Sequence, residues 1–455
     1  MLGYILLLVA LALYFNKSYR YLSVFLYISF MLGYGGGFGL WNDQVLGVKT
    51  MDLALIYTFA INGFLLVTWQ NPFRPFKGHK HFWLISYMVL VAFLLCCAVF
   101  SYVHYGFTPY QILQGGRSYL LILSLPILAR VKPWELQRIM ELCLWVTLAT
   151  SVLYILQIVV GRPLMPYALE YNLDSATGWV RLYNAPAMLR FFLMASFICP
   201  RFFPGNVNIY RVIFFAALMC TLGRTGIFTA LFGVVLATVL AGRATTFLKA
   251  VVVLGILFLP FMDVISQRFE KGDTRQDVAN VLEGKVTEYS GGDGTFTYRW
   301  AWIYERYDYL KDRPLGEKVF GLGMISGSQP VVYRMYRFRI GLVNEYGEVH
   351  QLNTPDTSYG NLLSNLGFVG MFLYLVFCVS LAVFLYRHRK ENPLMVICTA
   401  NLLVMFIGSM SGSALSEPRN FAVFFLAVSL LYKFRASSRL LNRESKWLLV
   451  NSSRR

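Results

Sequence analysis

Apolar stretches long enough to cross a lipid bilayer recur along almost the whole chain. A helix needs about 20 apolar residues to span the hydrocarbon core, with a range of about 17–25. Only 14% of the residues are charged, whereas a soluble domain carries about 25%. The sequence therefore predicts an all-α polytopic membrane protein with about 12–13 transmembrane helices. The apolar runs lie near residues 1–15, 21–35, 52–69, 83–103, 118–130, 140–160, 186–200, 210–222, 225–241, 247–264, 358–386, 394–410 and 419–433.

One long polar stretch interrupts this pattern, between about residue 265 and residue 357. It includes TYRWAWIYERYDYLKDR, whose apolar spacing predicts an amphipathic helix that ends before Pro314. A loop of this length without structure would be unusual, and its aromatic content argues against disorder. We therefore expect four regions, which are transmembrane helices at 1–264, a large loop at 265–357, further transmembrane helices at 358–435 and a basic tail at 436–455.

Lys and Arg are distributed unevenly among the connections between the apolar runs, since alternate connections are basic and the intervening ones are not. Cytoplasmic loops of membrane proteins collect Lys and Arg, so we expect the basic connections and the C-terminus to lie in the cytoplasm and the large loop on the opposite side of the membrane. In a Gram-negative cell that side is the periplasm. This bias also explains the net charge of +18 without nucleic-acid binding. The basic connections contain Lys17, Arg20, Arg74, Lys77, Lys80, Arg130, Lys132, Arg138, Arg201, Arg211, Arg243, Lys249, Arg387, Arg389 and Lys390.

Several arginines lie on the predicted outer side, against the charge bias. An arginine in or beside a span is costly and usually has a partner or a function. Guanidinium groups form bidentate contacts with phosphate oxygens, so the set predicts a site for a diphosphate. For each arginine the alternatives are extension to the membrane interface and pairing with a nearby acid. The set comprises Arg117 in LQGGRSYLL, Arg181 in GWVRLYNAPAM, Arg224 in TLGRTGIF, and Arg299 and Arg306 in TYRWAWIYER.

A second polar cluster lies at the end of the large loop, in VHQLNTPDTSYGNLLSNLGFVGMF. Its His350 and Asp356 are candidates for a general base at the outer membrane face. The alternative for Asp356 is a capping role at the start of the following helix. No phosphate-binding loop, dinucleotide fingerprint or metal-ligand spacing is found, and all seven cysteines lie in apolar stretches. We therefore expect no cofactor and no metal site.

Three local patterns resemble the O-antigen polymerase and O-antigen ligase superfamily, which includes the Wzy-type polysaccharide polymerases. The first is the short arginine turn GRTGIF between two spans. The second is an arginine, an aromatic-rich helix and a glycine turn, here YRWAWIYERYDYLKDRPLGEKVFGLGM, with Arg299 and Gly321-Leu322-Gly323. The third is PDTSYGNLLSNLGFVG, where Asp356 stands at the position of the histidine of the ligases. RLYNAPAM also resembles the family's Arg-then-Asn-Pro segment, although Ala185 interrupts the Asn-Pro pair.

The resemblance implies an architecture similar to that of the membrane-embedded GT-C-type glycosyltransferases. It implies polymerisation of undecaprenyl-diphosphate-linked repeat units into O-antigen or a related polysaccharide, without metal or nucleotide. Arg224, Arg299, Arg181 and Arg117 would then bind the diphosphate, and Asp356 or His350 would act on the acceptor hydroxyl. Membrane lipid and lipid-linked glycans are the expected partners, with a separate chain-length regulator protein as a further one.

Two other functions stay open at this point. A ligase that transfers the glycan to lipid A core is disfavoured because Asp356 replaces the expected histidine. A transporter of lipid-linked glycans is the alternative from another class. Transporters tend to show internal repeats and charges near the bilayer midplane, whereas the polar residues here concentrate in one loop and at helix ends.

Overall fold

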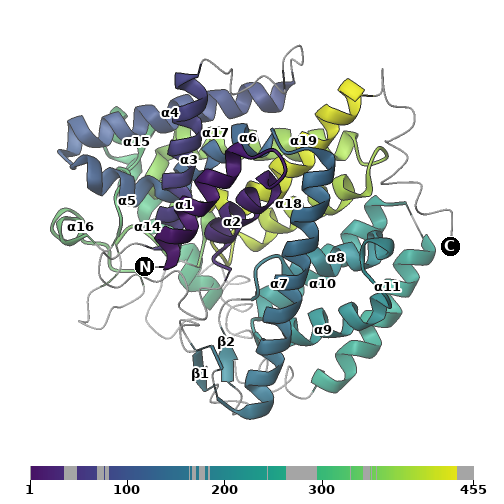
Figure 1. The fold of residues 1–455 in the computed structure, drawn as a ribbon. Helices are drawn as coiled ribbons and strands as arrows, with labels where there is room; N and C mark the ends of the chain where they lie inside the picture. The colour runs from purple at the N-terminus through teal and green to yellow at the C-terminus, as the bar shows by residue number, and fades with distance from the viewer. Residues whose placement is uncertain are drawn as a thin grey trace.

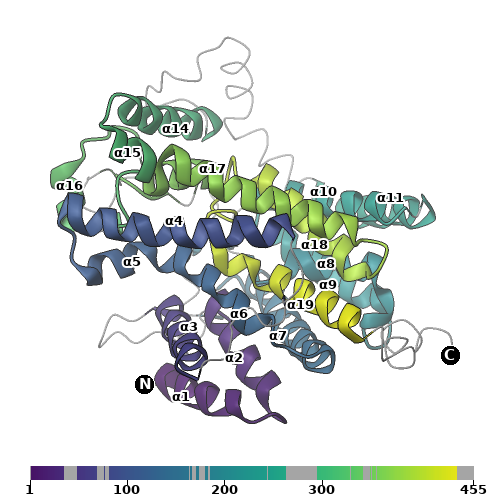
Figure 2. The same ribbon diagram turned by 90° about the horizontal axis from the view of Figure 1, so that it is seen from above.

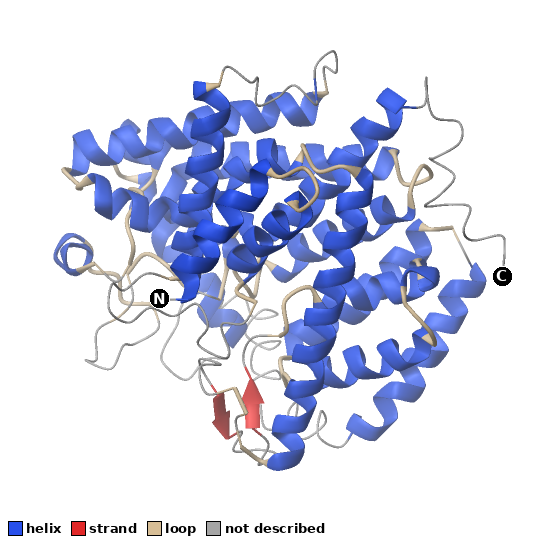
Figure 3. Cartoon of the chain, viewed as in Figure 1, coloured by secondary structure: helices blue, strands red, loops and turns tan. Residues whose placement is uncertain are grey.

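The protein folds into a bundle of α-helices (Figures 1 and 3). The computed structural model describes residues 2–34, 49–68, 76, 81–162, 164–165, 171–173, 180–182, 185–242, 244–262, 295–327, 329–341, 349, 351–354 and 356–437. The helices before the large loop are α1 (Leu2–Phe15), α2 (Arg20–Leu32), α3 (Thr50–Val67), α4 (Phe82–Tyr105), α5 (Pro109–Leu120), α6 (Leu125–Leu128), α7 (Pro133–Val160), α8 (Leu189–Ile198), α9 (Val207–Met219), α10 (Arg224–Leu240) and α11 (Ala244–Phe258). The large loop contains α14 (Thr295–Lys311), α15 (Leu315–Phe320) and α16 (Pro330–Met335). It is followed by α17 (Ser358–Arg387), α18 (Pro393–Gly408) and α19 (Ala422–Ser437).

Among the described residues, four helices are long and apolar enough to cross a membrane, namely α3, α4, α7 and α17. Eight shorter apolar helices accompany them: α1, α2, α8, α9, α10, α11, α18 and the segment that contains α19. The prediction of an all-helical polytopic membrane protein is confirmed. The boundaries of the four predicted regions stay predictions, since residues 263–294 and the tail from 438 lie outside the described residues.

The apolar run 118–130 does not form the single spanning helix that the sequence predicted. It is divided among the end of α5, the 3-10 turn η3 (Leu121–Ser124) and the four-residue α6. Pro126 stands at the start of α6, where its missing N–H and fixed φ favour a new helix over the continuation of the old one. Further 3-10 turns are η4 (Pro200–Phe202), η5 (Leu259–Phe261) and η6 (Pro418–Phe421).

A short hairpin departs from the all-α expectation. Strand β1 (Tyr171–Leu173) pairs antiparallel with β2 (Val180–Leu182), so that Asn172 lies opposite Arg181. The hairpin lies beside the carboxyl-terminal part of α7 (Figures 1 and 3). The sequence predicts only a connection for this stretch, because three-residue strands produce no periodic signal.

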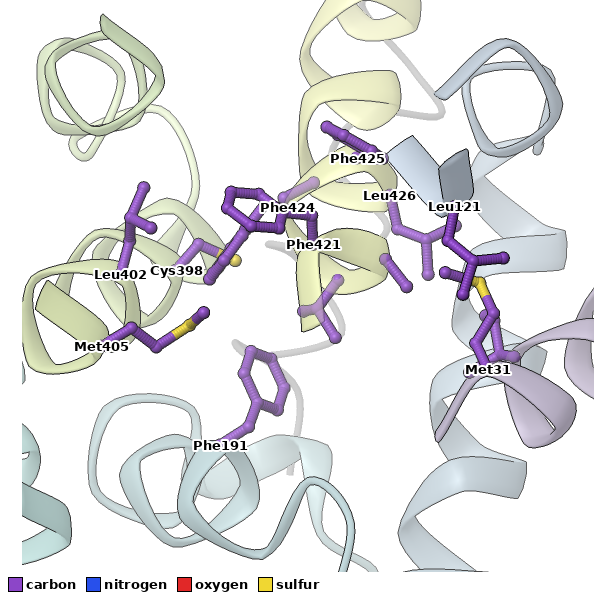
Figure 4. Close-up of a cluster of buried hydrophobic side chains, with 14 of the residues drawn as sticks. Met31, Leu121, Phe191, Cys398, Leu402, Met405, Phe421, Phe424, Phe425 and Leu426 are labelled. Carbon is purple, nitrogen blue, oxygen red and sulfur yellow. The ribbon is translucent and has the colours of Figure 1, made fainter. Parts of the chain in front are cut away.

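Helix α19 lies at the centre of the bundle. Its residues 422–432 are all buried, as expected of a helix that is apolar all round. Figure 4 shows Phe421, Phe424 and Phe425 between side chains of α18 and α8 on one side and side chains of α2 and η3 on the other. Helix α19 therefore connects the packing of α8 and α18 with that of α2 and η3.

The described helices of the large loop gather at one end of α4 and α17 (Figure 2). The backbone N–H of Met324 donates to Ser101 Oγ at 2.9 Å, and Tyr105 Oη donates to the carbonyl of Gly321 at 3.0 Å. Helix α14 is the amphipathic helix that the sequence predicted, and it ends before Pro314. The loop is therefore held against the carboxyl end of α4.

Two glycines allow the loop to enter a break in α17. Gly367 has φ +68° inside the helix, and Gly321 of the glycine turn has φ +77°. Leu322 N donates to the carbonyl of Ser364 at 2.7 Å, which this break leaves available. A Cβ atom on Gly321 would lie 2.5 Å from the backbone nitrogen of Gly367. Only glycine fits both positions, since each needs a positive φ and a close backbone approach.

We expect Gly321→Ala to lower the free energy of unfolding by more than about 1–2 kcal/mol, which is the cost of a left-handed conformation for an L-residue alone. The backbone overlap with Gly367 adds to this cost. Thermal unfolding of the purified protein measures the effect. Gly63→Ala in α3 is the matched control, because a Cβ there meets nothing within 4 Å. Equal unfolding midpoints for the two variants would contradict the described packing.

Candidate functional site

The structure brings together two of the predicted site residues, one from α14 and one from the segment before α17. Arg299 Nη2 lies 3.7 Å from Asp356 Oδ1, and the two side chains are 19% and 25% exposed. This separation exceeds a hydrogen bond, so the pair interacts by charge alone. Arg299 Nε is buried and makes no hydrogen bond with any described residue. The guanidinium, which has five N–H donors, therefore keeps donors available for an anionic ligand.

Asp356 is not the cap of α17, contrary to the alternative role that the sequence left open. Thr357 is the N-cap residue, and its hydroxyl accepts from the N–H of Gly360 at 3.5 Å. Asp356 Oδ2 instead accepts from Thr354 Oγ1 at 3.2 Å. Among the described residues its carboxylate is thus held by one hydroxyl and faces Arg299, which leaves it open to a further hydrogen-bonding group.

The segment that leads to Asp356 is fixed by amide side chains of α17. Asn361 accepts from Thr354 N at 3.0 Å and donates to Thr354 O at 2.7 Å. Asn365 Nδ2 donates to Asn353 Oδ1 at 2.8 Å and to Tyr119 Oη at 3.1 Å. These asparagines belong to SYGNLLSNLG, which the sequence analysis read only as the start of a span. Their signal was present, because amide side chains in an apolar helix need partners.

Arg224 lies at the same end of the bundle, as the first residue of α10. The next residue, Thr225, accepts a hydrogen bond from Ser411 Oγ at 3.1 Å. The neighbouring carbonyl of Gly412 accepts from Ser358 Oγ at 2.8 Å. The connection between α18 and η6 therefore links the start of α10 to the start of α17, two residues from Asp356.

Arg117 is engaged with an acid of another helix. Its Nη1 donates to Asp52 Oδ1 at 3.1 Å and to Oδ2 at 3.3 Å, and Asp52 belongs to the first turn of α3. The arginine side chain is 13% exposed. This is the acid pairing that the sequence analysis kept as an alternative, and it occupies one terminal nitrogen of the guanidinium.

For two other predicted residues the structure gives only the backbone position or no position. Arg181 lies in β2, where its backbone pairs with Asn172. His350 lies outside the described residues. Their predicted roles in diphosphate binding and in base catalysis stay predictions.

Arg306, which the sequence grouped with Arg299, is buried within the loop and stabilises its fold. Its side chain is fully buried, and its guanidinium carbon lies 3.9 Å from the ring centroid of Trp302. Nη1 donates to Glu305 Oε2 at 2.7 Å, and Nη2 donates to the carbonyl of Gln351 at 3.1 Å. Burial lowers the pKa of Arg306 to about 9, and Glu305 opposes this shift. The guanidinium therefore stays charged at neutral pH and fixes the segment that carries Asp356.

Arg190 of α8 is a basic residue that the sequence analysis did not single out. Its Nη1 donates to Thr229 Oγ1 at 3.4 Å, and no carboxylate of the described residues forms an ion pair with it. Thr229 follows Arg224 by little more than one helical turn, so the two arginines lie near the same end of α10. Arg190 stands near the start of an apolar run, where a charged residue is costly and often functional.

Metal-ligating side chains are scattered in the part of the chain that the structure describes. No group of three or more His, Cys, Asp and Glu residues there is close enough to hold a metal ion.

The comparison with protein families covers this site. Residues 209–375 match the family model described as O-antigen ligase. The matched segment contains Arg224, Arg299 and Asp356, together with the two glycines that join the loop to α17. The predicted resemblance to the O-antigen polymerase and ligase superfamily is confirmed. No curated protein matches the chain.

The O-antigen ligase match supports a glycosyl-transfer activity of the ligase or polymerase type in a bacterial membrane. It does not separate a polymerase from a ligase. Arg117, Arg181 and Arg190 precede the matched segment, so any part that they have in the site rests on the geometry alone.

Proposed function

We propose that the protein polymerises undecaprenyl-diphosphate-linked oligosaccharide repeat units into O-antigen or a related surface polysaccharide, at the periplasmic face of the inner membrane. The observation that carries the proposal is the pair formed by Arg299 and Asp356, 3.7 Å apart within the matched segment. A cation with unused donors and a carboxylate held beside it suit the two ends of a glycosyl transfer, the departing diphosphate and the attacking hydroxyl.

The reaction needs one bond broken and one bond formed. The bond between the anomeric carbon of the growing glycan and its diphosphate oxygen breaks, and undecaprenyl diphosphate leaves with the electron pair. A hydroxyl oxygen of the second lipid-linked unit bonds to the same carbon. Its proton passes to Asp356 or to the departing diphosphate. Arg299 and Arg224, with Arg190 as a further candidate, neutralise the charge that develops on the leaving group.

A polymerase is favoured over a ligase by one residue. Asp356 stands where the resemblance places the histidine of the ligases, and the structure shows that its carboxylate is free of a capping role. The ligase remains the second candidate because the matching family is described as O-antigen ligase. Lipid-linked glycans and membrane lipid are the proposed partners, with a chain-length regulator protein as a further one.

The deciding experiment uses the purified protein and a lipid-linked repeat unit, without added nucleotide or metal, and separates the products on a gel. A ladder spaced by one repeat supports the polymerase. A single starting band that shifts only when lipid A core is added supports the ligase. Strict dependence on an added metal ion would contradict the proposed metal-independent reaction.

The proposed orientation places α14 in the periplasm and the connection after α17 in the cytoplasm. We expect a cysteine at Lys311, whose side chain is 43% exposed, to react with a membrane-impermeant maleimide in intact spheroplasts. A cysteine at Arg389 should react only after permeabilisation, since it follows the opposite end of α17. Mass-shift gels measure both reactions, with the unsubstituted protein as background. The reverse pattern would invert the topology.

A further inference from the structure

Helix α14 presents an exposed face made of aromatic side chains. Trp300, Tyr304 and Tyr307 are 39%, 44% and 45% exposed. Their spacing of four and three residues places them on one side of the helix. The rings of Tyr304 and Tyr307 are 6.2 Å apart, and Tyr307 contacts Phe368 of α17 edge-on at 5.8 Å. We call these three residues the aromatic face.

The opposite side of α14 is fixed to the bundle. Trp302 and Arg306 are fully buried there, and a Cβ atom on Gly360 of α17 would overlap the indole ring of Trp302. Trp302 is therefore a packing residue, and the aromatic face is held rigidly outward. Rigid aromatic side chains bind ligands at low cost in conformational entropy.

The composition of this face differs from that of the lipid-facing helices. On α4 the exposed apolar side chains are mostly aliphatic, among them Ile85, Val89 and Leu95. On α14 the exposed large hydrophobic residues, within its described positions, are Trp and Tyr. Charged groups lie beside them, since Asp308 and Lys311 are about half-exposed and form an ion pair. Rings flanked by polar groups suit a ligand with C–H faces and hydroxyl edges, which is the chemistry of a sugar ring.

The aromatic face begins one residue after Arg299. At 1.5 Å of rise per residue it extends about 10 Å along α14, roughly the length of two pyranose rings. A diphosphate bound at Arg299 would place the first sugars of its glycan within reach of Trp300. The aromatic face therefore begins beside the proposed diphosphate site.

We propose that Trp300, Tyr304 and Tyr307 form a stacking surface for the sugar rings of the lipid-linked oligosaccharide. This inference rests on the proposed function and adds a glycan-binding subsite to it. It assigns the diphosphate to the arginines and the sugars to α14. Loss of the aromatic face should thus weaken the binding of the glycan and leave the binding of undecaprenyl diphosphate unchanged.

The test uses the full chain in lipid nanodiscs and two probes. One is the free oligosaccharide, released by mild acid from the lipid-linked repeat unit, and the other is undecaprenyl diphosphate. We expect Trp300→Ala and Tyr304→Ala each to weaken oligosaccharide binding about 5–10-fold, measured by calorimetry, with unchanged binding of undecaprenyl diphosphate. Tyr110→Ala is the matched control, since Tyr110 is 72% exposed on α5, away from α14.

Three results would overturn the inference. The first is undetectable oligosaccharide binding by the unsubstituted protein. The second is equal oligosaccharide affinity in the variants and the control. The third is quenching of Trp300 fluorescence by brominated lipid, which would place the ring in the membrane interface. The gel assay distinguishes failure of the stacking surface from failure of the proposed function. A normal ladder with equal affinities rejects only the stacking surface, whereas absence of a ladder with Trp300-dependent binding rejects only the polymerase.

Discussion

Replacement of Arg299 by alanine should lower the initial rate of glycan transfer about 100- to 1000-fold, the usual effect of removing one group that stabilises developing charge. The fold should survive, because among the described residues this guanidinium has only a long ionic contact, with Asp356 at 3.7 Å. Arg299→Lys should give an intermediate rate, since lysine keeps the charge and loses the bidentate geometry. The rate of ladder formation on a gel measures these effects.

The control for this prediction is Arg313→Ala, which removes another arginine of the same loop. Arg313 is 41% exposed and pairs with Glu317 at 3.0 Å, so its loss should leave the rate nearly unchanged. Arg224→Ala should lower the rate in the same direction as Arg299→Ala. Polymer formation near the normal rate in both alanine variants would exclude the proposed diphosphate site.

The positions of most helices follow from the sequence because each apolar run has one stable solution in lipid, a helix with satisfied backbone groups. The run 118–130 is the exception. Its apolar composition is the same as that of a span, and the break at η3 and α6 depends on Pro126 and on packing against other helices. The break in α17 at Gly367 could not be predicted either, since it exists to receive Gly321, a tertiary contact between distant segments.

The sequence indicates which residue types could form the candidate site, but not which residues each of them contacts. Five arginines looked alike on the predicted outer side, but the structure gives Arg117 an acid from α3 and buries Arg306 in an aromatic cage. These partners are distant in sequence or lie in segments without periodicity. Arg299 and Asp356 lie 3.7 Å apart, while their roles in binding and catalysis stay predictions. Arg190 could not be singled out from the sequence, because the apolar run around it predicts only a span.

Arg306→Ala should destabilise the protein by about 3–5 kcal/mol, the usual cost of removing one partner from a buried ion pair. The substitution leaves Glu305 without its cation at 2.7 Å and removes the donor to Gln351 O at 3.1 Å. It also opens a cavity between Trp302 and Phe338, whose ring centroids lie 3.9 and 4.4 Å from the guanidinium carbon. Thermal unfolding in detergent measures the loss.

The same variant should also lose activity, for a reason that separates it from Arg299→Ala. Gln351 accepts from Phe338 N at 2.6 Å and so joins two segments of the loop, and the chain reaches Asp356 five residues later. Loss of Arg306 therefore releases the segment that positions the carboxylate, and limited proteolysis between residues 338 and 356 should become faster. In Arg299→Ala the rate should fall with unchanged proteolysis and unfolding. An Arg306→Ala protein with the normal unfolding midpoint would show that this guanidinium does not hold the segment around Gln351 to α14.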